Sequence, residues 1–213
     1  MVRTLMKAII KVILIIIIIG ELRPIDSECL LTILDIIQNT IELNEHSFDN
    51  FNKEKLVNEI VKEHEIDERI IDNIVSWYTI DRKFNTITFV KEIGICVLKS
   101  NKQETVNTFM DKWNSNICYS LKSNVDLKLL RGRYLIDDNN LIKYFTSSSL
   151  SKIPSVRFQE VFRLRSKWFS DDLIPFLEDL GDSKELEKMI MKFCRTQFDK
   201  ISQRETYTSR QRI

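Results

Sequence analysis

Residues 157–180 read RFQEVFRLRSKWFSDDLIPFLEDL, and this stretch decides the expected fold of the C-terminal third of the chain. Its first apolar residues recur at helical intervals and predict one buried face: Phe158, Val161, Phe162 and Trp168. Ser170-Asp171-Asp172 is typical of a helix start, and the core residues expected after it are Leu173, Ile174, Phe176 and Leu177. Because Pro175 removes a backbone donor inside the second turn, we expect this helix to begin nearer Asp172 than Ser170.

The segment after this stretch predicts one more helix and a terminal strand. Gly181 is expected to end the preceding helix, and Ser183 to cap the last one. The apolar residues of that last helix are Leu186, Met189, Ile190 and Phe193. The polar tail Ser202–Ile213 is a candidate wing strand, so residues 151–213 are expected to form a C-terminal winged-helix-like domain.

A first unit, residues 26–90, has three helices followed by a short β element. Asp26 is the expected N-cap of a helix with apolar residues at helical spacing: Leu30, Ile33, Leu34, Ile37 and Ile41. A second helix carries Leu56, Ile60 and Val61, and a third begins at Asp67 and buries Ile70, Ile71, Ile74, Val75 and Tyr78. Thr86–Phe89 alternates like a strand. This is the order of elements in a winged helix.

A second unit, residues 91–150, repeats that order. Its expected helices are Lys91–Lys99, Glu104–Asn114 and Asp126–Leu130. Arg133–Ile136 and Leu141–Thr146 are expected to form a hairpin across the turn-prone tetrad 137–140, and the polar run Thr146–Lys152 reads as a linker. The predicted fold is therefore mainly α with short β wings, arranged as tandem winged-helix domains.

Composition excludes several classes of protein. The 213 residues include only 4 Gly and 3 Pro, too few for Gly-rich phosphate loops, sandwiches or barrels. The cysteines form no CxxC pair, and His46 and His64 lie at no useful spacing from any of them. We therefore expect no metal site and no cofactor, and interpret each cysteine as a small buried residue in a reducing compartment.

The N-terminal residues 1–25 leave two interpretations open. Arg3, Lys7 and Lys11 precede the apolar run Val12–Ile19, an order that imitates a signal peptide. A run of this length is too short to span a bilayer, which takes about 20 residues. Because isoleucine is β-branched, a buried strand or helix end is favoured, and a signal or membrane anchor is the alternative.

Charge is distributed unevenly along the chain. Residues 26–78 contain 4 Lys and Arg against 13 Asp and Glu, a balance of −9. Residues 128–167 contain 9 against 3, and residues 184–213 contain 8 against 4, balances of +6 and +4. A nucleic acid would therefore bind to the C-terminal half. The third helix of the first unit, with Asp67, Glu68 and Asp72 against Arg69, is expected to contact protein or to be structural.

Two basic groups are candidates for binding DNA. In the last helix, Lys184, Lys188, Lys192 and Arg195 are spaced to line one face, and the tail adds Arg204, Tyr207, Arg210 and Arg212. A solvated face neutralised by Glu185 and Glu187 is the alternative. The second group, Arg157, Arg163, Arg165 and Lys167, alternates with aromatic residues that suit base stacking, although core packing is favoured for them. Arg131 and Arg133 beside Gly132 suit either phosphate contact or solvent exposure.

No catalytic pattern occurs. The sequence contains no GxGxxG, P-loop, GxSxG or HExxH motif, and any pairing of its acidic residues into an acid–base couple would be arbitrary. We therefore expect a binding protein rather than an enzyme.

Residues 157–176 resemble a family pattern, RF-x-x-LF-x-x-R-x-KW-x-x-x-[DE]-[IL]-x-P-[YF], that belongs to the sister chromatid cohesion protein DCC-one family. Leu129–Gly132 with Tyr134–Asp137 is similar to the family's L-x-G-x-AL-x-D segment, Trp113 matches a family tryptophan, and Thr208–Arg210 is similar to the closing N-S-R. The proline at the position of Pro175 is also a family feature.

The resemblance implies a non-catalytic subunit of the alternative replication factor C, which loads sliding clamps onto DNA. It implies tandem winged-helix domains that contact DNA and DNA polymerase epsilon, other clamp-loader accessory subunits as partners, an indirect link to the sliding clamp and a nuclear location. By position, DNA contact falls on Arg157, Arg163, Arg165, Lys167, the last helix and the tail.

One departure from the family concerns its N-terminal β-rich region, which joins the other accessory subunits and has no counterpart here. Residues 20–25 resemble the wing of a preceding winged helix, so residues 1–25 are expected to be a remnant of that domain. Two other functions remain open: a protein-interaction scaffold without DNA binding, and a signal-anchored helical protein.

Overall fold

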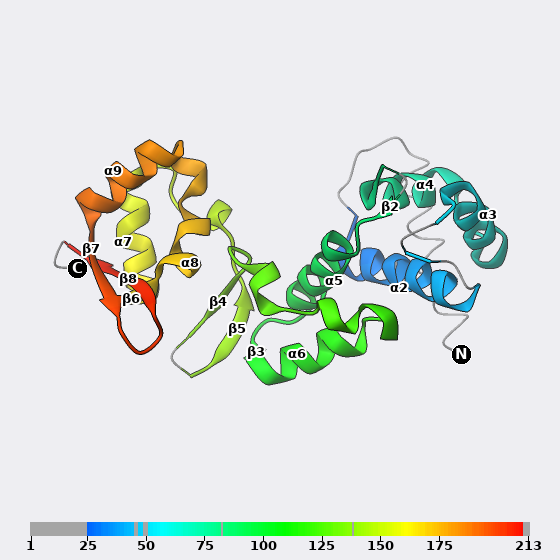
Figure 1. Cartoon of the computed structure of the whole chain (residues 1–213), viewed down its shortest axis with the longest axis horizontal. Helices are drawn as coiled ribbons and strands as arrows, with labels where there is room; N and C mark the ends of the chain where they lie inside the picture. The colour runs from blue at the N-terminus through cyan, green and yellow to red at the C-terminus, as the bar shows by residue number, and fades with distance from the viewer. Residues whose placement is uncertain (1–24, 45–46, 49–50, 82, 138, 211–213) are drawn as a thin grey trace. The chain divides into compact units, whose positions relative to one another are not determined.

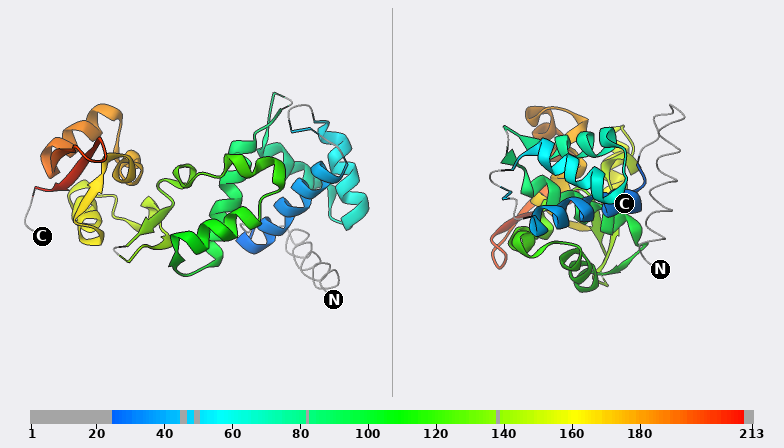
Figure 2. Two further views of the ribbon diagram at one scale, coloured as in Figure 1. Left: turned by 60° about the horizontal axis from the view of Figure 1, so that its bottom comes forward. Right: turned by 90° about the vertical axis from the view of Figure 1, so that its right-hand side faces the viewer.

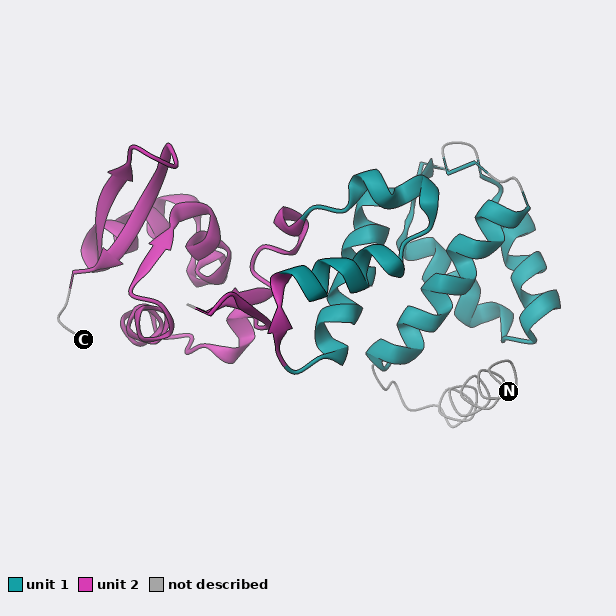
Figure 3. Cartoon of the chain, turned by 90° about the horizontal axis from the view of Figure 1, so that it is seen from below, with its two compact units in different colours: residues 1–102, 107–126 teal, residues 103–106, 127–213 magenta. Residues whose placement is uncertain are grey.

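The computed structural model of the chain describes residues 25–44, 47–48, 51–81, 83–137 and 139–210. Helices predominate in this part of the chain, and its strands form small antiparallel sheets (Figure 1). The chain divides into two compact units (Figure 3): the first runs to Lys102 and includes Asn107–Asp126, and the second comprises Gln103–Val106 and Leu127 onward. The isoleucine-rich run and the expected remnant at 1–25 lie outside the described residues, except for Ile25.

The described part of the first unit opens with helices in the predicted order, and the first and third start where the sequence predicts. They are α2 (Ser27–Leu43), α3 (Lys53–His64) and α4 (Glu68–Trp77). The Asp26 side chain accepts a hydrogen bond from the backbone N–H of Glu28, and the Asp67 side chain accepts one from Arg69. The predicted N-caps are thus confirmed, because these carboxylates satisfy free N–H groups of the first turn.

The predicted strand at Thr86–Phe89 is wrong. These residues begin the helix α5 (Thr86–Ser100), because the Asn85 side chain caps it by accepting a hydrogen bond from the Thr88 N–H at 3.0 Å. The short β element lies just before it, in the paired strands β1 (Thr79–Ile80) and β2 (Lys83–Phe84). The expected boundary between residues 90 and 91 therefore falls inside a helix.

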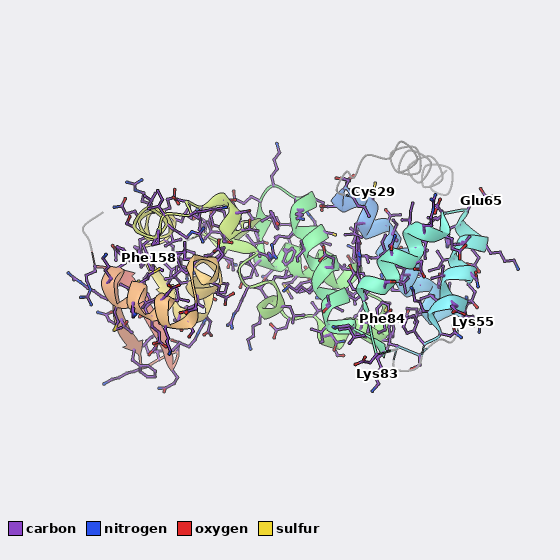
Figure 4. All side chains as sticks on the ribbon, turned by 90° about the horizontal axis from the view of Figure 1, so that it is seen from above. Cys29, Lys55, Glu65, Lys83, Phe84 and Phe158 are labelled. Atoms are coloured by element: carbon purple, nitrogen blue, oxygen red, sulfur yellow. The ribbon has the colours of Figure 1, made fainter. Side chains whose placement is uncertain are left out.

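Phe84 of β2 is the centre of an aromatic cluster in the first unit (Figure 4). Its ring centroid lies 5.0 Å from that of Phe89, 5.5 Å from those of Phe48 and Phe51, and 6.1 Å from that of Tyr78. Separations of this size suit tilted and edge-on ring contacts. The cluster fixes the two short strands against the start of α5.

Trp113 fixes the helix α6 (Val106–Ser115) against α5. Its side chain is fully buried, and its Nε1–H donates to the backbone oxygen of Val90 at 3.1 Å. A Cβ placed on Gly94 would lie 2.6 Å from the Trp113 ring, so only glycine allows this approach. The 3₁₀ helix η1 (Tyr119–Asn124) follows.

The second unit opens with a three-stranded sheet of order β3-β5-β4. Its elements are β3 (Glu104–Thr105), the 3₁₀ helix η2 (Leu127–Leu130), β4 (Tyr134–Ile136) and β5 (Leu141–Tyr144). The predicted hairpin is confirmed, and the Asp137 carboxylate holds its turn by accepting from the N–H groups of Asn139 and Leu141, both at 2.9 Å. The helix expected from Glu104 begins two residues later, because its first residues pair with β5.

The C-terminal part of the second unit has a second three-stranded sheet, of order β6-β8-β7. After the 3₁₀ helix η3 (Ser147–Ser149), its elements are α7 (Pro154–Leu164), β6 (Lys167–Phe169), α8 (Ser170–Leu173), the 3₁₀ helices η4 (Ile174–Phe176) and η5 (Glu178–Leu180), α9 (Ser183–Phe193), β7 (Cys194–Asp199) and β8 (Arg204–Ser209). Their shared core contains Phe158, Val161, Phe162, Trp168, Leu173, Phe176, Leu177, Leu186 and Phe193. This core includes most of the apolar residues predicted, although Trp168 lies on a strand.

Two predicted helix starts in this region need correction. The helix α8 begins at Ser170 and ends at Leu173, so Pro175 lies in η4, beyond the point where its missing N–H would break a helix. The N-cap of α9 is Asp182 rather than Ser183. Its carboxylate accepts from the Glu185 N–H, while the Glu185 carboxylate accepts from the Asp182 N–H, which completes a capping box.

All four cysteines are free thiols; Cys96, Cys118 and Cys194 are buried as predicted, and Cys29 is half-buried. Burial raises the pKa of Cys96 and of Cys194 to about 12. Within the described ranges, no three His, Cys, Asp or Glu side chains come together in a way that could hold a metal ion. A search of the same ranges finds no helix with the length and apolar character needed to cross a membrane.

Candidate nucleic-acid interface

Three lysines line the exposed face of α9. Lys184, Lys188 and Lys192 follow one another at intervals of four residues, and all three are exposed. The opposite face buries Leu186 and Phe193 in the core, which orients the lysines toward solvent. None of these lysines forms an ion pair with a described residue, so their charges are available to an anion.

A shallow depression of about 330 Å³ lies between α9 and the start of α7. Its lining is formed by Pro154, Ser155, Lys188, Met189, Lys192 and Phe193. The Lys192 ammonium lies 5.2 Å above the Phe193 ring, so an aromatic contact steadies one of the two cations. Helix N-termini also carry partial positive charge, and the start of α7 adds to this potential. The depression is therefore an electropositive surface.

Arg195 does not lie on α9. The helix ends at Phe193, and Arg195 is the second residue of β7, so its expected alignment with the three lysines is wrong. It pairs across the sheet with Thr208, which in turn pairs with Lys167 of β6. Residues paired in this way project from the same face of a sheet, so Arg195 and Lys167 form a separate basic row roughly 10 Å long.

Arg157 is a structural residue and is removed from the set of candidate DNA contacts. Its side chain is 1% exposed. Its Nε donates to the backbone oxygen of Ser151 at 2.6 Å, and its Nη1 donates to the backbone oxygen of Phe176 at 3.0 Å and to the Asp179 carboxylate. The guanidinium holds the pKa of Asp179 below its usual value. With these partners the guanidinium has no free edge for phosphate.

The remaining residues of this group differ in exposure. Arg163 on α7 and Lys167 on β6 are exposed, whereas Arg165 is half-buried with its guanidinium carbon 5.5 Å from the Trp168 ring centroid. The aromatic residues interleaved with them are buried: Phe158, Phe162 and Trp168. The core interpretation of these aromatics is thus confirmed, and the exposed cations form the surface above them.

Arg131 and Arg204 belong to an ion-pair network. Arg131 lies 3.2 Å from the Asp171 carboxylate, and Arg204 lies 3.5 Å from the same carboxylate and 3.6 Å from that of Asp172. Arg204 also stacks 4.0 Å above the Phe169 ring. These residues border a cavity of about 150 Å³ in the second unit. In the sequence, the two aspartates indicate only a helix start. Their ion pairs could not be predicted, because their partners are distant in the chain.

Other residues of the tail and of the Arg-Gly-Arg turn fall into three groups. Arg133 is exposed, and Arg210 is exposed with its Nε donating to the backbone oxygen of Cys194 at 3.1 Å. Tyr207 is buried, and its hydroxyl contacts the Glu205 carboxylate at 3.3 Å. Arg212 lies outside the described residues. Arg133 and Arg210 are thus further exposed basic residues of the second unit.

The first unit has a different character. Arg69, the basic residue of α4, is paired with Asp67 at 2.8 Å, and Asp72 of α4 is paired with Lys53 at 2.6 Å. At the end of this helix and on β1, Trp77 and Ile80 are more than half exposed. An acidic helix with exposed apolar groups suits contact with protein better than contact with phosphate.

Comparison with known proteins places the chain in a family. The sequence model of the family described as sister chromatid cohesion protein Dcc1 matches residues 5–177. The chain is 28% identical over 106 residues to sister chromatid cohesion protein DCC1 of Saccharomyces cerevisiae, which covers 49% of this chain and 27% of that protein. It is 25% identical over 120 residues to a probable sister chromatid cohesion protein DCC1 of Dictyostelium discoideum, covering 53% and 31%. With the Mus musculus protein of the same name, identity is 25% over 92 residues, covering 41% and 23%. The matched region thus spans less than a third of each relative.

Proposed function

The chain belongs to the sister chromatid cohesion protein Dcc1 family, and on that basis we propose that it is a non-catalytic subunit of an alternative replication factor C clamp-loader complex. In this role it binds DNA through its second unit and acts in the nucleus, in replication and sister chromatid cohesion. DNA polymerase epsilon and the other accessory subunits of the clamp loader are its protein partners.

The order of helices and strands along the chain supports this role. Along the chain, the first series is α5, β3, α6, η1, η2, β4 and β5. The second is α7, β6, α8, η4, η5, α9, β7 and β8, which keeps the same order but adds the helix α9 before its hairpin. Each set ends in a hairpin whose last strand is central, with sheet orders β3-β5-β4 and β6-β8-β7. A helix followed by a hairpin is suited to bind along a duplex, because the helix enters a groove while the hairpin contacts the backbone.

The observation that carries the DNA-binding proposal is the row of unpaired lysines on α9. They are Lys184, Lys188 and Lys192, beside an electropositive depression and on the third helix of the C-terminal set. Like charges at helical spacing repel by a few tenths of a kcal/mol per pair in the free protein. A polyanion offsets this repulsion, which favours binding of phosphates at this surface.

The test replaces Lys188 and Lys192 with glutamate and measures affinity for primer–template DNA as a function of salt. Loss of two phosphate contacts is expected to reduce the magnitude of the salt slope, the slope of log affinity against log salt concentration, by about 2. The matched control replaces Lys55 and Lys62 of α3, in the acidic unit, with the same charge change; Lys55 is visible in Figure 4. An unchanged affinity and slope in the α9 variant would refute the DNA-binding surface.

A second candidate function is a protein-interaction scaffold that uses the first unit, and the exposed Trp77 and Ile80 favour it. In this function the acidic α4 docks on a basic partner surface, with the two apolar side chains as its anchor. The wild type is then expected to capture purified DNA polymerase epsilon without binding DNA, and Trp77→Ala is expected to abolish that capture. Retained capture by Trp77→Ala would contradict this assignment.

A further inference from the structure

The tip of the β7–β8 hairpin exposes two large apolar side chains. Ile201 is 96% exposed, the highest value among the large hydrophobic residues of the described ranges, and Phe198 is 58% exposed. Lys200, directly before Ile201, is also exposed. The hairpin end projects away from α7 and α9 in Figure 1, and the right view of Figure 2 also shows it extending outward.

The turn that presents Ile201 is held by its own hydrogen bonds. The Asp199 carboxylate accepts from the Ile201 N–H at 3.2 Å and from the Ser202 hydroxyl at 2.7 Å, and these bonds lower the pKa of Asp199. The Gln203 side chain donates to the backbone oxygen of Lys200 at 2.8 Å, and Gln203 adopts a left-handed φ of 54°. The exposure of Ile201 is therefore imposed by a defined turn.

The other hairpin of the second unit shows that such a turn needs no apolar tip. Between β4 and β5, the described tip residues are Asp137, Asn139 and Asn140, and none of them is a large hydrophobic residue. Folding buries almost none of the Ile201 side chain and leaves more than half of Phe198 exposed. An apolar pair kept at the end of a structured hairpin is typical of a contact surface.

The charges around the tip indicate what it contacts. Lys200 lies at the tip, and Arg195 and Lys167 form the exposed basic row along the same sheet. Proteins that insert aliphatic or aromatic wedges between base steps offset the cost of unstacking with cationic contacts to the adjacent phosphates. A wedge of apolar residues with cations behind it matches this arrangement.

We propose that the β7–β8 tip is a wedge that inserts Ile201 between bases of DNA at a junction of double and single strand. Bases at such a junction have fewer stacking partners to lose, so insertion costs least there. Phe198 packs against the displaced base and Lys200 binds the flanking phosphate, while Arg195, nearer the start of β7, binds the DNA backbone farther from the tip. This inference rests on the proposed binding of DNA by the second unit and specifies which DNA structure it recognises.

The test uses a primer–template duplex with 2-aminopurine at the junction, since this base becomes brighter when it is unstacked. The full chain is expected to raise the fluorescence, whereas Ile201→Ala and Phe198→Ala reduce that rise and weaken binding to the junction about tenfold. The salt slope of Ile201→Ala stays at the wild-type value, because no phosphate contact is lost. Leu43→Ala, at an aliphatic residue of the first unit that is 81% exposed, is the matched control and behaves as the wild type.

Three results would overturn the wedge. If the wild type binds DNA with a salt slope but does not change the fluorescence, the wedge is wrong and the DNA-binding function stands. If Ile201→Ala binds the junction as the wild type does but fails to capture DNA polymerase epsilon, the tip is a protein contact. If the wild type does not bind DNA at all, the proposed function fails together with the wedge. Circular dichroism of each variant verifies that the fold is retained.

Discussion

The Arg157→Met variant loses a buried guanidinium and keeps most of the aliphatic length of the side chain. In the wild type this group donates to the backbone oxygens of Ser151 and Phe176 and to the Asp179 carboxylate, so it joins three segments of the second unit. Methionine replaces none of these donors. The variant therefore tests whether Arg157 stabilises the fold or contacts DNA.

The expected loss of stability follows from those partners. A buried carbonyl left without its donor costs about 1–3 kcal/mol. The Phe176 oxygen is buried, and the Ser151 oxygen is partly buried and costs less. The Asp179 carboxylate adds little, because it is half-exposed and regains water. The expected change in unfolding free energy is thus about 3 kcal/mol, or a fall of roughly 10 °C in melting temperature.

The assay is urea and thermal unfolding followed by circular dichroism, with DNA affinity measured well below the melting temperature. Arg163→Met, on the exposed side of the same helix, is the control and is expected to change stability by less than about 0.5 kcal/mol. The structural role of Arg157 would be refuted if both variants unfold alike, or if Arg157→Met weakens DNA binding while its stability is unchanged.

Three further predictions concern other features of the chain. Gly132→Ala should destabilise the protein by about 2 kcal/mol in urea unfolding, because Gly132 has a φ of 76° and a Cβ there would lie 2.7 Å from the Cβ of Pro175; wild-type stability would contradict this. Cys96 and Cys194 should resist iodoacetamide at pH 8 until the chain is unfolded in urea, since burial keeps both thiols protonated; rapid labelling of the native chain would show that they are accessible. Because the pKa of Asp179 is lowered in the folded chain, its carboxylate stabilises the fold above its unfolded pKa, and this contribution is lost as pH falls through its folded pKa. Asp179→Asn should therefore show a shallower loss of stability below about pH 4 than the wild type. Identical acid profiles would exclude this contribution.

Local signals were sufficient for most helix starts in the fold. The side chains of Asp26 and Asp67 each cap a helix within two residues, so the sequence alone locates these starts. The alternation at Thr86–Phe89 was misleading, because it spans only one helical turn. The Asn85 cap, together with the burial of Val90 and Ile93 at helical spacing, decides for a helix there.

The candidate site was harder to predict, because the burial and position of its side chains depend on partners that are distant in the chain. Arg157 has the same local sequence setting as Arg163, yet it is buried because Asp179, 22 residues away, accepts its hydrogen bond. Arg195 follows the lysine spacing of α9, but the change from helix to strand at Cys194 moves it to the sheet. The alignment of the three α9 lysines could be predicted from the period of one helix alone, and they lie where that period places them.

Hydrogen exchange with and without DNA tests the central claim that the second unit binds DNA through α9 and the β7–β8 hairpin. The full chain is compared free and bound to primer–template DNA at low salt, with peptides resolved across both units. We expect slower exchange within Ser183–Ser209 and unchanged exchange within α2, α3 and α4. Protection confined to the acidic helices, or no protection within Ser183–Ser209 at saturating DNA, would contradict the account.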